Sequence, residues 1–402
     1  MSNRRRLVLP LSLALLVATG SACRQFDVPP DPLEDLRINE IQVVGSHNSY
    51  KIQPSDGLQA AIQFVYDNLP PNSGVPDPGG LVYTHRPLAE QFGDLGIRQI
   101  ELDVWVDRLG GTFAVPFGPA AAMALGQAAG PDFDPGDIML GPGIKVFHIQ
   151  DIDFRSHCPL FLQCLEEIKA WSDANPDHLP ILILVELKEE VPDVDLSALG
   201  LAFAIPTPWA LQDLQELEDN IRTVFHDTRL IQPNDVRAGY PTLFEGIQAE
   251  GWPRVSDARG KVFFALDNEG AQRDIYVGHY PGLDGAVIFT SSPTGSPEAG
   301  FRKENNPFRT GPSIEELVQA GYMVRTRADA DTVEARANDT GRRDAALASG
   351  AQFVSTDYRE PNPAFIPPSD YQVQLPGLPP GAVARCNPAS TLATCASDLI
   401  EP

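Results

Sequence analysis

Short hydrophobic runs recur along the chain and are separated by segments with helical periodicity or with loop composition. Such runs, bounded by polar or turn residues, are typical of buried β-strands. They predict eight strands, at residues 40–45, 97–106, 145–149, 181–187, 261–266, 286–290, 321–326 and 352–356. Apolar positions three and four apart predict helices between them, clearest at residues 87–95, 160–175, 208–225, 313–320 and 342–349.

Alternation of strand and helix around the whole chain predicts an α/β fold, a parallel (β/α)8 TIM barrel. An open, doubly wound parallel sheet is the alternative. No GxGxxG or GxxxxGK[ST] sequence follows the first predicted strand, which disfavours both the open sheet and a nucleotide-binding function. We therefore expect one barrel domain over residues 38–360.

Three connections are longer than a minimal barrel needs, at residues 53–80, 110–143 and 291–312. They are rich in Pro, Gly and Asp, and long segments without regular structure are usually functional. We expect these loops to form the rim of a site. Residues 361–402 are Pro-rich and aperiodic, which predicts a C-terminal wrap and not a second domain.

Composition and charge narrow the range of partners. Hydrophobic residues make up 43% of the 402 residues and charged residues 21%, a globular balance. The formal net charge of −24 repels phosphate backbones, so nucleic acid is an improbable partner. An acidic excess usually reflects a solvated face, but it is also compatible with a divalent-cation site.

The first residues predict export. Three arginines precede an apolar run that is too short to span a bilayer, and small residues follow it up to Cys23. We interpret residues 1–22 as a signal peptide and residues 23–37, with three prolines, as an extended tether. Cys23 is a candidate lipidation site, so the sequence predicts either a bacterial cell-envelope lipoprotein or a secreted protein.

Four cysteines remain after that segment, an even number in a chain bound for an oxidising compartment. Short loops close most easily, so among three possible connectivities we favour the pairs Cys158–Cys164 and Cys386–Cys395. Their spacing does not match paired CxxC metal ligands.

Polar residues gather where the first four predicted strands end, the edge at which barrels of this class build their sites. Side chains two apart on a strand share a face, so Glu101 and Asp103 point together, as do Glu186 and Lys188. Several carboxylates can be buried together only if a cation neutralises them. The predicted ligands are all oxygen donors and suit Ca²⁺ better than zinc: Asn48, Glu101, Asp103 and Glu186.

Two histidines, His47 and His148, follow the first and third predicted strands and flank that ion. One imidazole can act as a base or stabilise anionic charge while the other protonates a leaving group. Lys188 adds a positive charge toward a phosphate. Each residue alone is more often structural than functional, but their joint occurrence at successive strand ends favours phosphodiester cleavage.

At these positions the chain resembles the phosphatidylinositol-specific phospholipase C superfamily of barrel phosphodiesterases, in particular its calcium-dependent, secreted bacterial type. The similarity covers about residues 38–359 and rests on His-Asn at 47–48, Glu-x-Asp at 101–103, and His148 and Glu186. The segment Tyr83-Thr84-His85-Arg86-Pro87-Leu88 is similar to one that precedes the second strand in that subgroup.

The resemblance implies a residue-level mechanism for a phosphoric diester hydrolase. His47 would stabilise the pentacovalent phosphate, His148 would protonate the diacylglycerol oxygen, and the inositol 2-hydroxyl would attack to give a cyclic phosphate. His85 would be a further acid, base or phosphate contact, or alternatively a cap of the helix beginning near Pro87. Membrane contact would come from lipidated Cys23 or from the rim aromatics Phe113, Phe117 and Trp209.

Two other functions remain open. The glycerophosphodiester phosphodiesterases are similar in the Glu-x-Asp and Glu-x-Lys sequences, but they usually have arginine where this chain has Asn48. The ending Thr356-Asp357-Tyr358 is similar to the last strand of either family. A catalytically inactive calcium-binding surface scaffold is the third function, although all six expected site positions are filled.

Overall fold

The computed structural model describes residues 33, 35–68, 77–365, 367–389 and 395–401. Cys23 and the expected signal peptide lie outside these residues, as does most of the expected tether. Near its end the tether prediction is wrong, because Leu36 is only 2% exposed and belongs to the hydrophobic core. Within the described residues, no helix is long and apolar enough to cross a membrane.

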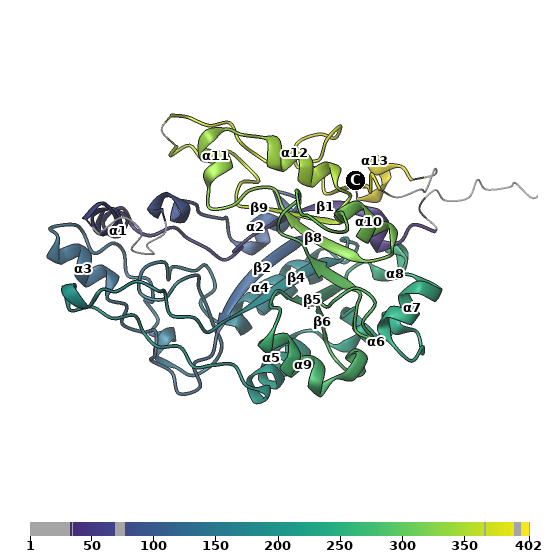
Figure 1. Cartoon of the computed structure of the whole chain (residues 1–402), viewed down its shortest axis with the longest axis horizontal. Helices are drawn as coiled ribbons and strands as arrows, with labels where there is room; N and C mark the ends of the chain where they lie inside the picture. The colour runs from purple at the N-terminus through teal and green to yellow at the C-terminus, as the bar shows by residue number, and fades with distance from the viewer. Residues whose placement is uncertain (1–32, 34, 69–76, 366, 390–394, 402) are drawn as a thin grey trace, which may run out of the picture. The chain divides into compact units, whose positions relative to one another are not determined.

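Eight parallel strands form the barrel, in the order β6-β5-β4-β2-β1-β9-β8-β7 (Figure 1). A parallel bridge between Ser291 and Phe301 joins the two outer strands β6 and β7. The predicted TIM barrel is therefore confirmed and the open sheet is wrong. The strands are β1 (Ile41–Ser46), β2 (Gln99–Trp105), β4 (Ile181–Lys188), β5 (Val262–Leu266), β6 (Ile288–Thr290), β7 (Phe301–Lys303), β8 (Met323–Arg327) and β9 (Phe353–Thr356).

The prediction of eight barrel strands is confirmed in number, but one of the eight predicted segments is not a barrel strand. Residues 145–149 do not form a parallel barrel strand. Only β3 (Lys145–Val146) is extended there, and it pairs antiparallel with β2, with Val146 opposite Val104. The true eighth strand is β7, which lies inside the segment predicted to be the loop 291–312. Its polar sequence Phe-Arg-Lys lacks the apolar run that marks the other strands, because Arg302 and Lys303 are only half-buried.

Helices surround the barrel, and the five predicted ones are present with ends shifted by a few residues (Figure 1). Ser313 caps its helix as the sequence indicated, since its hydroxyl accepts a hydrogen bond from the Glu316 amide at 3.1 Å. The helices are α1 (Asp56–Asn68), α2 (Leu88–Gly93), α3 (Gly118–Ala124), α4 (Phe161–Ala174), α5 (Leu211–Val224), α6 (Pro233–Arg237), α7 (Leu243–Glu250), α8 (Val255–Ala258), α9 (Ala271–His279), α10 (Ile314–Gln319), α11 (Val333–Ala337), α12 (Gly341–Ala348) and α13 (Ser397–Ile400).

The long connections contain more regular structure than the sequence indicated. α1 lies in the first and α3 in the second, and the two helices pack against each other. Two of the three expected rim aromatics are instead core residues: Phe113 is 5% exposed and packs on Trp105 and Phe147, and Trp209 is 4% exposed. Phe117 alone of the three keeps partial exposure.

The C-terminal segment packs along the barrel. A short strand, β10 (Ala384–Cys386), pairs antiparallel with β1, and Val373 and Leu375 are buried in the core. Both predicted disulfides are confirmed, Cys158–Cys164 and Cys386–Cys395. Two disulfides fit an exported protein that matures in an oxidising compartment.

Candidate active site

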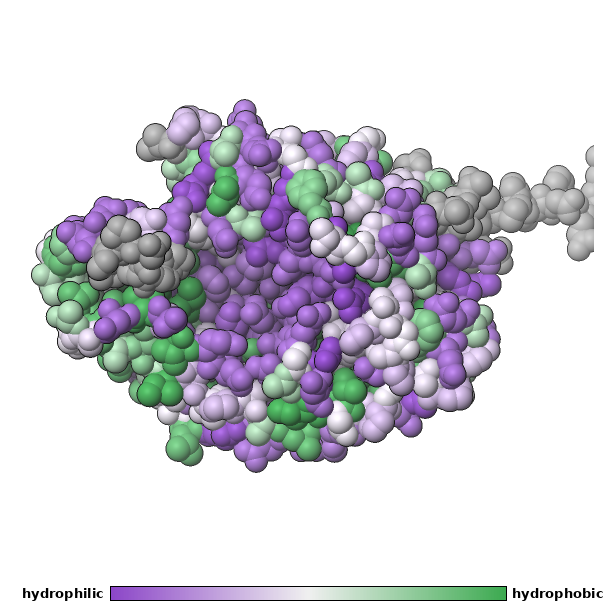
Figure 2. Space-filling model, in the orientation of Figure 1, coloured by the Kyte–Doolittle hydropathy of each residue, from purple (hydrophilic) through white to green (hydrophobic). Residues whose placement is uncertain are grey.

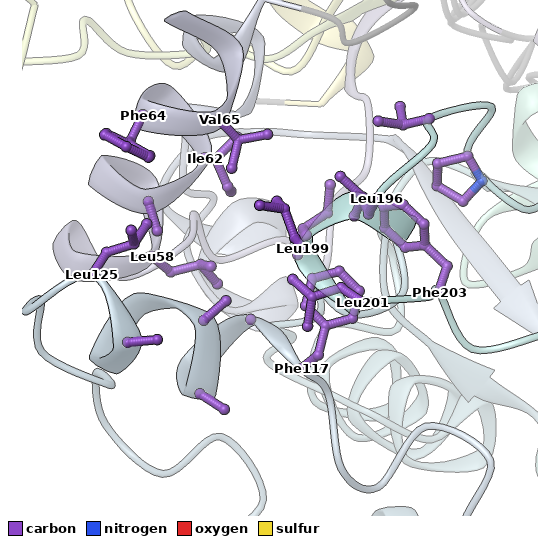
Figure 3. Close-up of a pocket in the computed structure, with 18 of the residues that line it drawn as sticks. Leu58, Ile62, Phe64, Val65, Phe117, Leu125, Leu196, Leu199, Leu201 and Phe203 are labelled. Atoms are coloured by element: carbon purple, nitrogen blue, oxygen red, sulfur yellow. The ribbon is translucent and has the colours of Figure 1, made fainter. Parts of the chain in front are cut away.

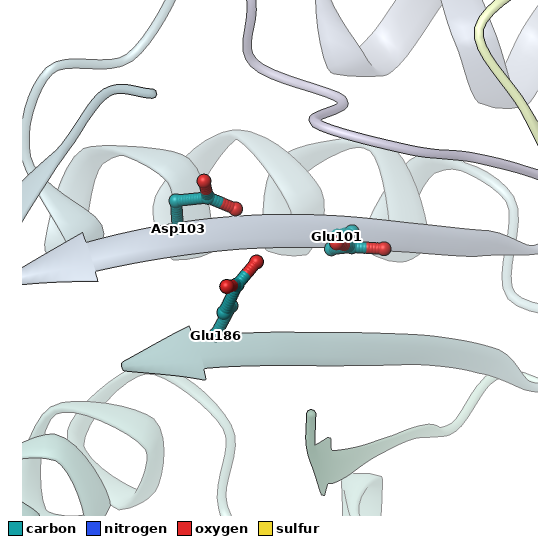
Figure 4. A group of neighbouring side chains, drawn as sticks. All are labelled: Glu101, Asp103 and Glu186. Atoms are coloured by element: carbon teal, nitrogen blue, oxygen red, sulfur yellow. The ribbon is translucent and has the colours of Figure 1, made fainter. Parts of the chain in front are cut away.

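Three carboxylates converge at the mouth of the barrel, on the strands that the sequence indicated. Glu101 and Asp103 project from β2, and Asp103 lies directly opposite Glu186 of β4 in the parallel register (Figure 4). One oxygen from each of the three carboxylates lies within 4.8 Å of the others. The prediction that these side chains would share one face is confirmed. Figure 2 shows that hydrophilic residues line a hollow at the centre of this side of the molecule.

Asn48 completes an all-oxygen donor set. It follows β1 with a left-handed φ of 47°, and its amide Nδ2 donates a hydrogen bond to the Tyr83 hydroxyl at 2.9 Å. The Oδ1 atom then has no hydrogen-bond partner among the described residues, and neither does either carboxylate oxygen of Asp103, although all three are buried. Buried oxygens without hydrogen bonds are rare and costly, and a hard cation would satisfy them.

Burial and nearby negative charge disfavour ionised carboxylates in this cluster. Burial raises the pKa of Asp103 well above its usual range, and the charge of Glu186 adds to the effect. Lys188 lies 3.2 Å from Glu186 Oε1 and 3.7 Å from Asp103 Oδ2. Although burial disfavours its ammonium, these two carboxylates outweigh that effect and raise the pKa of Lys188. The donor set therefore fits Ca²⁺, which would offset the same negative charge.

Glu101 is held from two sides. Arg325 of β8 donates a hydrogen bond to its Oε2, while Nε2 of His47 lies 3.6 Å from its Oε1. Burial raises the pKa of Glu101 to about 7, although Arg325 acts in the opposite direction. This carboxylate thus links the candidate metal ligands to the first candidate catalytic histidine.

His47 is positioned by an aspartate from the last barrel strand. Its Nδ1 lies 2.8 Å from Oδ1 of Asp357, whose other oxygen lies 3.3 Å from Nη2 of Arg327. Burial lowers the pKa of His47 well below its usual range, and the charge of Arg327 contributes. The imidazole is therefore neutral at neutral pH in this arrangement.

His148 is positioned in the same way but from a different kind of element. It follows the short antiparallel β3, so the prediction that it ends a third barrel strand is wrong. A tight hairpin over residues 148–153 brings its Nδ1 to 2.6 Å from Oδ2 of Asp153. Fully buried Lys51 lies 3.2 Å from the same carboxylate oxygen. His148 nevertheless lies close enough to His47 for its charge to contribute to the lowered pKa of His47.

A candidate all-oxygen cation site, one aspartate–histidine pair against it and a second pair close to the first form an arrangement suited to phosphodiester chemistry. A sequence model of a family described as "Phosphoinositide phospholipase C, Ca2+-dependent" matches residues 36–388. The chain belongs to this family. It is a calcium-dependent phosphoinositide phospholipase C, with the phosphodiesterase activity that this class of enzyme carries out.

Solved structures with the same description are similar to this chain. The calcium-dependent phosphoinositol-specific phospholipase C of Pseudomonas sp in its apo form is 16% identical, covers 89% of this chain and 97% of its own, and has a TM-score of 0.46. The Ca²⁺-dependent enzyme from Streptomyces antibioticus is 18% identical, with coverages of 80% and 95% and a TM-score of 0.45. No curated protein matches the chain significantly.

His85 supports His47 from behind. Its Nε2 donates a hydrogen bond to the backbone carbonyl of His47 at 2.7 Å, and its ring is 7% exposed. Burial lowers the pKa of His85 to about 4. The alternative that it caps a helix is wrong, because α2 has Pro87 at its N-cap and no side-chain cap. The structure places His85 against the backbone of the first candidate catalytic histidine of this phospholipase.

Several residues of the candidate phospholipase site were not found from the sequence. Asp153 and Lys51 come from loops with no distinguishing pattern, whereas Arg325 and Arg327 lie two apart at the end of β8. That spacing puts both guanidinium groups on one face, the same signal that identified Glu101 and Asp103 on β2. Applied to basic residues as well, it would have found these two arginines.

Proposed function

We propose that this enzyme cleaves phosphatidylinositol between the phosphate and diacylglycerol, and that His47, His148 and the acidic cluster carry the reaction. The observation that supports it most directly is that each histidine has an aspartate on Nδ1, that His47 lies 3.6 Å from the candidate cation ligand Glu101, and that His148 lies close enough to His47 for their charges to interact. An aspartate on Nδ1 fixes the tautomer and the ring orientation, so Nε2 is directed toward substrate.

Asn48, Glu101, Asp103 and Glu186 would hold Ca²⁺. When bound, the ion would lower the pKa of the attacking hydroxyl and offset charge on the phosphate oxygens. Lys188, within hydrogen-bond reach of Glu186, would add a positive charge toward the phosphate. We infer that these groups bind and orient the headgroup, since positioning supplies much of the rate in phosphoryl transfer.

The two histidines take different roles in this mechanism. His47 lies against Glu101 and directs its neutral Nε2 to the reacting groups, where it accepts the proton of the attacking 2-hydroxyl. The imidazolium that forms then stabilises the pentacovalent phosphate. His148, with Asp153 stabilising its imidazolium, donates its Nε2 proton to the diacylglycerol oxygen. The inositol 2-hydroxyl is the nucleophile, so phosphorus exchanges one oxygen for another within one molecule and a cyclic inositol phosphate is released first.

Substrate in a bilayer requires contact with a membrane surface, and we propose that exposed rim side chains provide it. Leu109 is 91% exposed, Val115 87% and Leu140 58%. The segments of Leu109 and Leu140 run side by side, as the amide of Gly111 donates to the carbonyl of Met139 at 3.0 Å. Exposed apolar side chains gathered on one rim are typical of membrane contact. A lipid on Cys23 would add a second anchor.

The decisive experiment measures release of labelled inositol phosphate from phosphatidylinositol vesicles, with calcium and with chelator. Wild type is compared with His148→Ala, and glycerophosphoinositol serves as a parallel substrate. Calcium-dependent lipid cleavage that the variant loses supports the proposal. Cleavage of the soluble diester alone would indicate a glycerophosphodiesterase, and tight calcium binding without turnover of either substrate would indicate a scaffold.

A further inference from the structure

An apolar groove lies beside the hairpin that carries His148. Its volume is about 360 Å³, within the range of roughly 300–1,000 Å³ seen for small-molecule sites. Every residue that lines it is apolar or glycine. Figure 3 shows Leu58, Ile62 and Val65 of α1 on one side, with Leu199, Leu201 and Phe203 across from them.

The carboxylate of Asp151 connects two segments beside the groove to the hairpin that carries His148. Asp151, at the tip of the hairpin, accepts hydrogen bonds from the amide of Phe117 at 3.0 Å and from that of Ala204 at 2.7 Å. It thereby joins the segment before α3 to the loop that follows β4. The rings of Phe117 and Phe203 then meet edge to face with centroids 5.3 Å apart.

Close packing at Gly118 holds α3 against the hairpin that carries His148. Gly118, the first residue of α3, donates its amide to the carbonyl of Asp151 at 3.2 Å. A Cβ at this position would lie 2.4 Å from that carbonyl oxygen and 2.9 Å from Leu58, so only glycine allows the approach. The groove is therefore a built feature of the hairpin and not a gap between loosely packed loops.

The groove adjoins the hairpin that carries the proposed acid His148. Ile149 and Ile152 line its floor, and both belong to the hairpin between His148 and Asp153. The proposed function assigns His148 to the diacylglycerol oxygen. Ile149 directly follows His148, so the hydrocarbon chains of a diacylglycerol bound with that oxygen at His148 would start within one residue of the groove lining.

We propose that the groove binds an acyl chain of the lipid substrate while the headgroup occupies the barrel mouth. The inference rests on the proposed function and adds the recognition of the substrate's hydrocarbon part. Phe64 is 52% exposed and Leu199 55%, so a chain laid between them removes apolar surface from water. A peptide segment fits less well, because the described residues that line the groove offer no polar side chain to its amide and carbonyl groups.

The test uses monomeric short-chain phosphatidylinositols of increasing chain length, kept below the concentration at which they aggregate. In wild type each methylene buried in the groove should lower KM about fourfold, the factor that corresponds to about 0.8 kcal/mol. Ala121→Trp places a large ring in the groove, since Ala121 is a half-buried lining residue. This variant should retain turnover of the shortest substrate while its KM no longer depends on chain length.

A smaller change and a matched control keep the test decisive. Leu199→Gln should raise KM several-fold for the longest chain and leave the shortest unchanged. Ile205→Gln removes an equally apolar side chain that is 79% exposed on the same loop but outside the groove, and it should behave as wild type. If Ala121→Trp fails to fold, as judged by circular dichroism and thermal unfolding, the dependence of KM on chain length in Leu199→Gln tests the proposal.

The possible failures are distinguishable. No cleavage of any phosphatidylinositol by wild type would overturn the proposed function itself. Cleavage with a KM independent of chain length, or an equal dependence in the groove variants, would overturn only the acyl-chain assignment. A wild-type dimer that Ala121→Trp dissociates in sedimentation would make the groove a subunit interface instead.

Discussion

Nδ1 of His47 lies 2.8 Å from Oδ1 of Asp357, although 310 positions separate the two residues in the sequence. The contact follows from the barrel order, because β1 and β9 are neighbouring parallel strands in which Ser46 pairs with Thr356. The residues directly after both strands therefore meet at the carboxyl edge of the sheet. Closure of the barrel thus positions His47, the first candidate catalytic histidine.

Asp357→Asn should abolish most of the activity while leaving the fold intact. The amide can donate to Nδ1, which permits the wrong tautomer of His47, so kcat should fall about 10²- to 10⁴-fold. Steady-state kinetics with phosphatidylinositol measures the loss, and nitrogen NMR of the His47 ring reports the tautomer. Asp94→Asn is the matched control, since the Asp94 side chain is 64% exposed and makes only a surface ion pair with Arg86. Unchanged kcat in Asp357→Asn would contradict the role.

Asp103→Asn should have opposite effects on the protein with and without calcium. Without the ion, replacing a buried carboxylate whose pKa is raised by burial should leave thermal stability equal or higher. With the ion, calcium affinity should fall by about tenfold or more because a charged ligand is lost. Calcium at about 100 times the wild-type Kd should stabilise wild type by about 2.7 kcal/mol, and at the same calcium concentration a tenfold weaker affinity should reduce this gain to about 1.4 kcal/mol or less.

Calorimetric titration and thermal unfolding with and without chelator provide these measurements for Asp103→Asn. Glu190→Gln, an exposed acid on the loop after β4, is the control and should bind calcium as wild type does. Equal calcium affinities in wild type and Asp103→Asn would exclude Asp103 as a ligand.

Much of this site could be predicted because it lies on strands. Alternation along β2 places Glu101 and Asp103 on one face in any fold that contains this strand. The two disulfide pairs could be predicted because the short loops within them close most easily. The error in the barrel arose where local pattern and tertiary pairing disagree. The run before His148 is apolar, yet it pairs antiparallel on β2, whereas polar β7 is a barrel strand.

The side chains that contact the candidate catalytic groups could not be predicted from the sequence, for a different reason. Lys51 and Asp153 meet 3.2 Å apart in a fully buried ion pair, and neither lies in a periodic segment. A charge in a loop usually faces solvent, so only the packed structure can indicate that these two are buried and paired.

His85 should act by positioning His47 and not by exchanging protons. Its pKa is lowered to about 4 by burial, so it stays neutral between about pH 5 and 8 and cannot shape the pH–rate profile there. His85→Gln, whose amide can still donate to the His47 carbonyl, should keep most of the activity. His85→Ala removes that donor and should lower kcat about tenfold. Profiles of kcat against pH test both variants, and a pH dependence altered in His85→Gln would restore the acid–base role.

His178 should make the protein less stable in mild acid, independently of the catalytic site. Its ring is 3% exposed, and Nδ1 donates to the Leu179 carbonyl at 2.6 Å while Nε2 lies 2.7 Å from the Ser172 hydroxyl. Burial lowers the pKa of His178 to about 4, and nearby Arg98 and Arg229 also disfavour the imidazolium.

Between about pH 4 and 6.5 the unfolded chain therefore binds a proton at His178 that the folded protein does not bind. The free energy of unfolding consequently rises with pH across this range. The contribution of neutral His178 to the free energy of unfolding is at most about 3 kcal/mol. It is fully present above about pH 6.5 and is lost as the pH falls toward about 4. Denaturant unfolding across this range should give a shallower pH dependence for His178→Gln than for wild type. Exposed His226 supplies the control, because His226→Gln should leave the slope unchanged. Identical slopes in wild type and His178→Gln would show that other groups govern the acid sensitivity.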